Sequence, residues 1–373
     1  MNHFYRFPWE SAYTGGEVCP DWAAETRDNQ HHITADISYA VRQFLAVTGD
    51  TRILSDMLDN RSGCQFVAAM AEFWAGRAVL DEATGLYDIT HVMGPDEYHG
   101  TTDNNVYTNV AAGMAIYFAR YVSCVGGCQD IPEEWVDVAK SLSLQYDEAR
   151  DYHPQYEGYQ EGTKIKQADT ILVGYPLMYE MKESTRRNDL VMYEKVTDIG
   201  GPAMTWGMHA IGHLELGEEE QAVDLFRRSY EPYVHPPFYM WTENILGTGA
   251  INFLTGMGGF LQGVIFGYLG LRTRLNQMDF NPKLPPGCSS INSTGIDYHE
   301  AVFDIKVVPE YVIVEVESAG KGLEIVQNGE SFVIAEPESI SLARERFSII
   351  PLNVDYLERC PLPLDKIGGS TVY

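Results

Sequence analysis

The sequence predicts a mainly α-helical barrel or toroid that is followed by a small antiparallel β-sandwich. Two observations favour this fold class. From about residue 30 to residue 270, apolar side chains recur at helical spacing between loops, which predicts roughly nine helices and few strands. From about residue 277 onward, apolar and polar residues alternate instead, which is typical of short strands. We therefore assign residues 1–272 to the helical part, residues 273–350 to the sandwich and residues 351–373 to a poorly ordered tail.

Each helix is expected from its own apolar periodicity and from the residues at its ends. Asp103 or Asn104 can cap a helix that runs to about Val122, and Pro202 is well placed to open a later one. The helix after Gly217 has acidic residues first and basic residues last, which suits the helix dipole. The expected helices cover residues 31–47, 64–79, 103–122, 133–144, 166–175, 188–196, 202–216, 218–230 and 250–269.

The expected strands are short runs separated by turn residues. Residues 301–308 and 311–316 alternate apolar with polar positions on either side of a two-residue turn. Residues 323–326 and 331–335 flank Asn328-Gly329, a dipeptide that favours hairpin turns. An antiparallel sandwich fits the length and spacing of these runs.

The chain is strongly acidic, with 53 acidic and 26 basic residues and a formal net charge of −27. Such a surface repels phosphate backbones and anionic lipid, so we expect no nucleic-acid partner and no membrane partner. The six cysteines and ten histidines show no usual zinc, metal or redox spacing. We therefore expect no metal, no cofactor, and reduced thiols in a cytoplasmic protein. The sequence leaves the oligomeric state open.

The first candidate site is the loop Gly94-Pro95-Asp96-Glu97-Tyr98-His99. The Pro-Asp turn is expected to project Glu97, and the neighbouring aromatic rings would limit water and favour the protonated acid that a proton donor needs. An ordinary loop carboxylate is the simpler interpretation. The amides that follow, Asn105 among them, suit sugar hydroxyls, although Asn104 could instead cap a helix.

The second candidate site is Trp241-Thr242-Glu243-Asn244, just ahead of two glycines. Trp241 could stack on a sugar ring, although buried aromatic packing explains it more simply. Glu243 could supply a second carboxylate. Sugar hydrolysis needs two carboxylates that face each other across a glycosidic bond, one to donate a proton and one to activate water.

Two further segments could contact a substrate. Lys166 and Gln167 open an expected helix, where their side chains could bond sugar hydroxyls, and a solvated surface lysine is the simpler alternative. The loop that begins at Phe7 adds Trp9 and Glu10, and a plain structural turn explains that loop equally well.

Taken together, these motifs resemble glycoside hydrolase family 65, the family of acid trehalases and of maltose, kojibiose and trehalose phosphorylases. The resemblance covers almost the whole chain to about residue 320. Its segments, found here in the family's order, include Phe7-Pro8-Trp9-Glu10-Ser11-Ala12, Pro95-Asp96-Glu97-Tyr98-His99, Asn105-Val106-Tyr107-Thr108-Asn109 and Lys166-Gln167-Ala168-Asp169.

The resemblance implies a six-hairpin (α/α)6 toroid followed by a β-sandwich, and hydrolysis of an α-glucosidic bond with inversion and without a metal. Carried onto this sequence, it implies Glu97 as general acid and Glu243 as general base. Their carboxyl groups should then lie about 6.5–9.5 Å apart, which leaves room for a water. The implied substrate is the α-glucosyl-galactosyl unit on collagen hydroxylysine, from which glucose would be released. The expected substrate-binding residues are Trp9, Glu10, His99, Asn105, Lys166, Gln167 and Trp241.

Relatives in the family carry a β-sandwich and the first barrel helices ahead of the Phe-Pro-Trp motif, whereas this chain starts shortly before Phe7. Roughly nine helices, where a six-hairpin toroid needs twelve, indicate the same deficit. We therefore expect an incomplete toroid in a fragment, a truncated gene model or a shortened paralogue. The alternatives to a glucosidase are an α,α-trehalase, an α-glucoside phosphorylase and a non-catalytic glycan-binding remnant. A carboxylate base at Glu243 favours a hydrolase, because phosphate replaces water as the nucleophile in the phosphorylases.

Overall fold

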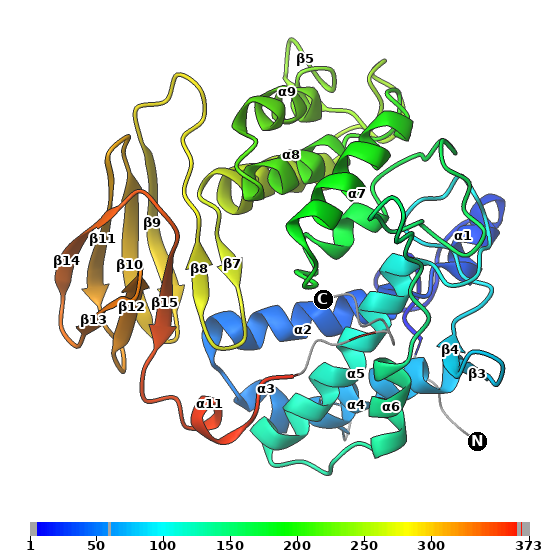
Figure 1. Ribbon diagram of the computed structural model, residues 1–373, viewed down its shortest axis with the longest axis horizontal. Coiled ribbons are helices and arrows are strands. Elements are labelled where there is room, and N and C mark those ends of the chain that lie inside the picture. The colour runs from blue at the N-terminus through cyan, green and yellow to red at the C-terminus, as the bar shows by residue number, and fades with distance from the viewer. Residues whose placement is uncertain (1–5, 59–60, 364–366, 368–373) are drawn as a thin grey trace. The chain divides into compact units, whose positions relative to one another are not determined.

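The computed structural model describes residues 6–58, 61–363 and 367 of the chain, drawn in colour in Figure 1. The chain forms two compact units. The first contains residues 1–40, 52–205 and 363–373, and the second contains residues 41–51 and 206–362. The first unit is mainly helical, and the second combines helices with all the longer strands. The predicted class, mainly α with a C-terminal antiparallel β region, is therefore confirmed.

The first unit is built around two long helices, α4 and α5, that pack together. Ser62 caps α4 in a reciprocal pair with Gln65, and Asn105 caps α5 by accepting the N–H of Thr108. Nearly all of α5 is buried, so it forms the centre of this unit. The elements are η1 (Asp21–Ala23), α1 (Ala24–Asn29), α2 (Ile33–Thr48), α3 (Arg52–Ser55), β1 (Met57–Leu58), β2 (Arg61–Ser62), α4 (Gly63–Arg77), β3 (Val79–Asp81), β4 (Leu86–Asp88), α5 (Val106–Gly126), α6 (Glu133–Lys140), η2 (Thr170–Val173) and α7 (Glu183–Val196).

The helices of the second unit lie close to the ranges that the sequence predicts. The helix α9 has Glu219 and Glu220 in its first turn and Arg227 and Arg228 in its last, as the dipole favours. The elements before the sandwich are α8 (Trp206–Glu215), α9 (Glu219–Tyr230), β5 (Val234–His235), β6 (Met240–Trp241), α10 (Leu254–Gln262) and the π-helical turn η3 (Gly263–Tyr268).

The sandwich in the second unit consists of two antiparallel sheets, in the orders β14-β11-β10-β9 and β13-β12-β15-β8-β7. Alternating side chains of both sheets fill one core that includes Phe280, Phe303 and Ile325. A short helix, α11 (Asp355–Arg359), follows the last strand. The strands are β7 (Arg272–Thr273), β8 (Met278–Phe280), β9 (Ile291–Tyr298), β10 (Ala301–Val307), β11 (Tyr311–Ser318), β12 (Leu323–Gln327), β13 (Glu330–Ile334), β14 (Glu338–Ala343) and β15 (Phe347–Pro351).

Three expectations about helix ends were wrong. Residues 166–169 are not helical, and the N–H of Lys166 is donated to Asp96 and that of Ala168 to Thr205 in the conformation they adopt. Only the short turn η2 follows them. Asn104 does not cap α5. Its side chain instead accepts the N–H of Ile89 and donates to the carboxylates of Asp88 and Glu157. Finally, α8 begins at Trp206 and not at Pro202.

The expectation of reduced thiols was wrong for four of the six cysteines, because Cys64, Cys124, Cys128 and Cys360 are disulfide-bonded. A disulfide joins Cys64, in the first turn of α4, to Cys128, just after the end of α5. The two cysteines are 64 residues apart, so inspection of close spacings alone could not find the pair. Cys19 and Cys288 carry free thiols. Because a cytoplasmic location was inferred partly from reduced thiols, it stays a prediction.

The predicted tail falls partly outside the described residues, namely on 364–366 and 368–373. Its described part includes α11 and the buried Ile367, whose carbonyl accepts the hydroxyl of Tyr179. The predicted domain boundaries at residues 272 and 350 stay predictions. Within the described ranges, every helix is too short or too polar to traverse a lipid bilayer.

Candidate active site

The side chain of Asp96 fixes the loop that carries its neighbour Glu97. The Asp96 side chain is buried, with 2% of the residue exposed. Its carboxylate accepts the backbone N–H of Lys166 at 2.7 Å, the N–H of Tyr98 at 3.3 Å and the side-chain amide of Gln155 at 3.2 Å. Burial raises the pKa of Asp96, while these donors oppose that rise. Asp96 thus joins the Glu97 loop to the Lys166 segment, although they are about 70 residues apart.

A second buried carboxylate, that of Asp169, contacts the backbone of Asp96. It accepts the backbone N–H of Asp96 at 3.1 Å and the side-chain amide of Asn105 at 3.0 Å. Burial raises the pKa of Asp169 to about 7, with the N–H of Asp96 opposing and the Asp96 charge adding to the rise. Gly94 is required beside it, because a Cβ atom there would collide with the side chains of Asp169 and Asn105.

Glu97 itself is paired with Lys166, whose ammonium Nζ lies 2.5 Å from its Oε2. Both side chains are partly accessible, at 24% and 28%. The sequence predicted an aromatic, water-poor setting for Glu97, whereas the structure places an ammonium group beside its carboxylate. Within the described part of the chain, Oε1 of Glu97 has no hydrogen-bond partner and is left for a ligand.

The two aromatic neighbours of Glu97 point to other groups. The hydroxyl of Tyr98 donates to Asp198 at 2.7 Å, and Lys164 also pairs with Asp198 at 2.8 Å. The Nε2 atom of His99 lies 2.9 Å from the carbonyl oxygen of Lys164, and its ring packs against Tyr156. Nε2 of His99 also lies 3.4 Å from the buried carboxylate of Asp96, so both side chains contact groups other than the Glu97 carboxylate.

Two glutamines near this loop offer acceptors that the chain does not use. Gln167 donates its amide to the carbonyl of Pro95 at 2.6 Å, as Gln155 does to Asp96. In both side chains the Oε1 atom is buried and has no hydrogen-bond partner among the described residues. A buried carbonyl without a donor is costly, so these atoms are suited to the hydroxyl groups of a ligand. Gln155 was missed because it belongs to no recognisable motif.

The Trp9 loop is connected to the Glu97 loop through Gln30. The indole Nε1 of Trp9 donates to Oε1 of Gln30 at 2.6 Å, and Nε2 of Gln30 donates to the sulfur of Met93 at 3.6 Å. Met93 directly precedes the Glu97 loop. Gln30 is buried, and sequence reasoning missed it.

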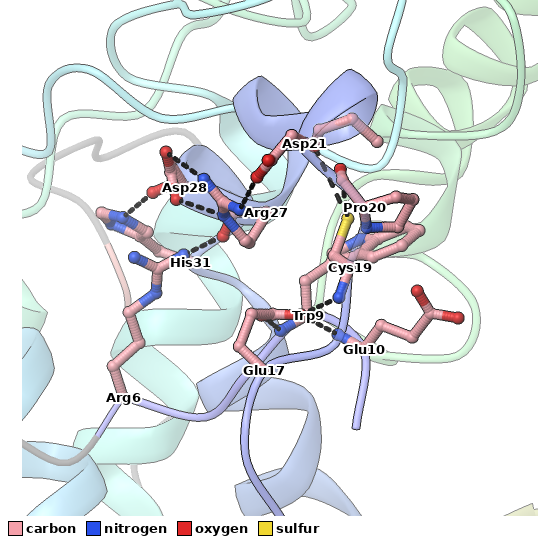
Figure 2. Close-up of polar contacts among 11 residues, drawn as sticks. Arg6, Trp9, Glu10, Glu17, Cys19, Pro20, Asp21, Arg27, Asp28 and His31 are labelled. Carbon is pink, nitrogen blue, oxygen red and sulfur yellow. Dashed lines mark hydrogen bonds and ion pairs between the residues drawn. The ribbon is translucent and has the colours of Figure 1, made fainter. Parts of the chain in front are cut away.

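Figure 2 shows how Glu17 organises the Trp9 loop. Its carboxylate accepts the backbone N–H groups of Trp9, Glu10 and Cys19 at 2.7, 3.2 and 2.9 Å. Partial desolvation is outweighed by these donors, which together lower the pKa of Glu17. The carboxylate of Glu10 points away from this cluster and is exposed.

Trp241 and Glu243 lie in the second unit, Trp241 at the end of β6 and Glu243 on the tight loop that follows. One carboxylate oxygen of Glu243, Oε2, accepts the backbone N–H of Ala250 at 2.8 Å. Among the described residues, the other oxygen has no hydrogen-bond partner. Gly249 has φ +77° and faces Glu243 so closely that a Cβ atom would collide with it. The Trp241 ring packs 5.7 Å from that of Phe260, so part of its surface is used in packing.

The structure therefore brings Glu97, His99, Asn105, Lys166 and Gln167 together, with Trp9 connected to them through Gln30. Glu243 and Trp241 form a separate cluster in the other unit. The separation predicted between Glu97 and Glu243 joins two units that are described individually, so it stays a prediction. Within the described ranges, no three His, Cys, Asp or Glu side chains are grouped to hold a metal ion.

Two regions of the chain match domains of a known enzyme family. Residues 5–165 match the glycosyl hydrolase family 65 central catalytic domain, and residues 271–334 match the C-terminal domain of that family. Both candidate sequence motifs of the first unit, at Trp9 and Glu97, fall within the first match.

The chain is also similar to curated proteins over most of its length. It is 41% identical to protein-glucosylgalactosylhydroxylysine glucosidase of Gallus gallus, with 90% of this chain and 47% of that protein covered. It is 44% identical to the protein of the same name in Dictyostelium discoideum, with 81% of this chain and 41% of the relative covered. The chain thus spans about half the length of the curated relatives it matches.

A solved structure shares the fold. It is described as a candidate kojibiose phosphorylase from human microbiome, with a TM-score of 0.70 and 17% identity. The match covers 91% of this chain and 53% of the solved one. At this identity the likeness shows the fold alone, which is consistent with an (α/α)6 helical domain followed by a β domain.

Proposed function

Glycosyl hydrolase family 65 domains account for residues 5–165 and 271–334 of this chain, and from that premise we propose that it is an inverting α-glucosidase. The observation that carries the proposal is the Glu97 loop. Two buried carboxylates fix its backbone while its own carboxylate stays accessible beside Lys166. A rigid loop with one accessible acid is what proton transfer to a leaving oxygen requires.

The proposed substrate is a glucosyl-galactosyl unit on hydroxylysine, from which glucose is released. The relatives from Gallus gallus and Dictyostelium discoideum support this choice, because both are named protein-glucosylgalactosylhydroxylysine glucosidase. The partner is accordingly a small carbohydrate or a glycosylated hydroxylysine. The unused Oε1 atoms of Gln155 and Gln167 support a substrate that is rich in hydroxyl groups.

In the proposed reaction, Glu97 is the general acid that protonates the leaving oxygen. Lys166 pairs with Glu97 in the free protein, so a sugar hydroxyl that accepts from Lys166 would bind directly beside the acid.

Glu243 is proposed as the general base that activates water. Its Oε2 atom is held by the N–H of Ala250, which fixes the side chain and leaves Oε1 for a water molecule. With inversion, the two carboxyl groups lie about 6.5–9.5 Å apart in the active protein.

The remaining contacts are proposed from the positions of the side chains. Lys166, Gln167 and His99 border Glu97 and would bind sugar hydroxyls, with Glu10 and the rings of Trp9 and Trp241 at the edges of the site. Asn105 is only 1% exposed, so in this proposal it supports the site through Asp169.

Glucose release from glucosyl-galactosyl-hydroxylysine, trehalose and maltose tests the function. We expect release from the first substrate, and Glu97→Gln should lower its rate at least about a hundredfold, because the leaving oxygen loses its acid. The matched control is Glu82→Gln, an exposed turn carboxylate that should leave the rate unchanged.

Added phosphate separates the hydrolase from the phosphorylase that the solved neighbour's description suggests. Glucose 1-phosphate as the product would replace the present proposal with a phosphorylase. Preferred cleavage of trehalose would replace it with a trehalase. Sugar binding without turnover, unchanged in Glu97→Gln, would leave a glycan-binding protein.

A further inference from the structure

A polar cavity of about 340 Å³ lies within the second unit. It is bordered by the C-terminal end of α8, by η3 and by strands β7, β8 and β15. None of the residues proposed above for the glucosidase lines it. Its charged and amide-bearing lining includes Glu215, Arg272, Arg274, Gln277, Asp279 and Arg346. Such a volume is within the range of small-molecule sites.

Arg272 and Glu215 form the internal support of this cavity. Arg272 is 8% exposed and donates to the carbonyls of Phe266 and Leu271, and its guanidinium lies 3.2 Å from Glu215. The charges of these two side chains therefore offset each other. Arg272 is committed to holding the chain and is not available to a ligand.

Arg274 is oriented by Asp279 but keeps donors to spare. Its Nε atom donates to Asp279 at 2.6 Å, and Asp279 also accepts from Ser348 at 2.7 Å and from Gln277. The two terminal nitrogens of Arg274 have no partner among the residues that the structure describes. A guanidinium held through Nε presents these two N–H groups in a fixed orientation.

Arg346 lines the same cavity from the start of β15. It is exposed, and one terminal nitrogen donates to the carbonyl of Glu215 at 3.2 Å. Its Nε and its other terminal nitrogen have no partner in the described part of the chain. Two guanidinium groups with unused donors thus border one cavity, with Arg272 already committed.

The charge of this lining is opposite to that of the molecule. Arg272, Arg274 and Arg346 against Glu215 and Asp279 leave one net positive charge, in a chain whose formal net charge is −27. An anion between two such guanidinium groups would satisfy their unused N–H donors. Arginine forks match the oxygen geometry of phosphate in a bidentate manner.

We propose that this cavity binds a phosphate group between Arg274 and Arg346, either as the free ion or as part of a small phosphorylated sugar. The N–H groups of the two arginines would hold the phosphate oxygens. The amides of Gln277 and Asn281 line the remaining wall and suit the hydroxyls of an attached sugar. The site is independent of the proposed glucosidase reaction.

Calorimetric titration of the whole chain with inorganic phosphate and, separately, with a hexose phosphate tests the site. We expect saturable binding that is at least about tenfold weaker in Arg346→Gln and in Arg274→Gln, because each change removes a charge-assisted donor pair. Tighter binding of the hexose phosphate would identify the sugar-linked form, and equal binding would identify the free ion.

Two matched controls locate the binding. Arg344→Gln removes an arginine two residues from Arg346 that instead donates to the carbonyl of Pro309, so phosphate affinity should stay within about twofold of the wild type. Lys166→Gln tests whether the phosphate occupies the Glu97 site, and it should also leave the affinity unchanged.

Some results would overturn the site. They are the absence of saturable binding, equal affinity in the wild type and Arg346→Gln, or loss of affinity in Lys166→Gln. Loss of thermal stability in Arg346→Gln and Arg274→Gln, without any change in phosphate affinity, would show that these arginines only support the end of α8.

Discussion

Asp169 is the residue whose chemistry depends most on its burial. Only 1% of it is exposed, and its neighbours are the N–H of Asp96 and the amide of Asn105, not a cation. Because burial raises its pKa to about 7, the folded protein holds a proton that the unfolded chain releases near the ordinary value of 3.8. The folded state therefore loses stability as the pH rises from about 4 to about 7.

Replacing Asp169 by Asn should remove that dependence on pH. The wild type should lose free energy of unfolding, on the order of a few kcal/mol, between pH 5 and pH 8, whereas Asp169→Asn should change much less. Urea unfolding at the two pH values measures the difference.

Asp198→Asn is the matched control for this prediction. Hydrogen bonds from Lys164 and Tyr98 lower the pKa of Asp198 to about 2, so its contribution to stability is present above about pH 4 and is lost only as the pH falls toward 2. The control should therefore shift stability equally at pH 5 and pH 8. A wild type that is as stable at pH 8 as at pH 5 would contradict the assigned protonation of Asp169.

Individual residues differed in how far the sequence could predict them. Glu97 and Lys166 were named as candidate site residues, but their ion pair was not predicted. The two segments are held together by the bond from the Lys166 N–H to Asp96, which the sequence does not reveal. Asp96 and Asp169 lie within the predicted motifs, yet their burial was not predicted, because a carboxylate in a polar segment is usually exposed. The apolar run that follows Asp169 was the available signal that its surroundings are buried.

At the scale of elements, the start of α5 links the fold to the candidate site. Oδ1 of Asn105 accepts the N–H and the hydroxyl of Thr108, both at 2.8 Å, while its amide nitrogen donates to Asp169. The Asn105 side chain therefore caps the N-terminus of α5 and also holds the carboxylate of Asp169.

Two cap substitutions separate these tasks. Asn105→Ala should cost about 1–2 kcal/mol for the cap and a further ~1–3 kcal/mol for the unpartnered Asp169, and it should lower glucosidase turnover. Ser62→Ala removes the cap of α4 and should cost about 1 kcal/mol without changing turnover. Chemical unfolding and rates of glucose release measure both. Equal effects of the two substitutions on turnover would show that Asn105 only caps.

Elements with local causes were predicted, and those with distant causes were not. The periodicity of α5 and the charges of α9 are local, and both helices were found close to their expected ranges. Residues 166–175 had the same apolar spacing, but hydrogen bonds to Asp96 and Thr205 hold residues 166–168 in a non-helical conformation. The strands β9, β14 and β15 were missed individually because their pairing partners, not their own patterns, define them.

At the scale of the whole molecule, the acidic surface and the two proposed sites have different electrostatic characters. A formal net charge of −27 favours neutral ligands, which agrees with a sugar at the Glu97 site. The arginine-lined cavity of the second unit is a local exception that suits a phosphate group. The chain spans about half the length of its curated relatives, and the proposed activity rests on the residues that this chain contains.

The stereochemistry of the released glucose tests the central proposal most directly. Proton NMR of the first glucose formed from glucosyl-galactosyl-hydroxylysine should show the β-anomer, because water activated by Glu243 attacks opposite the bond that Glu97 protonates. Glu243→Gln should abolish this signal. Release of α-glucose, or no release of glucose by the unaltered chain, would contradict the account.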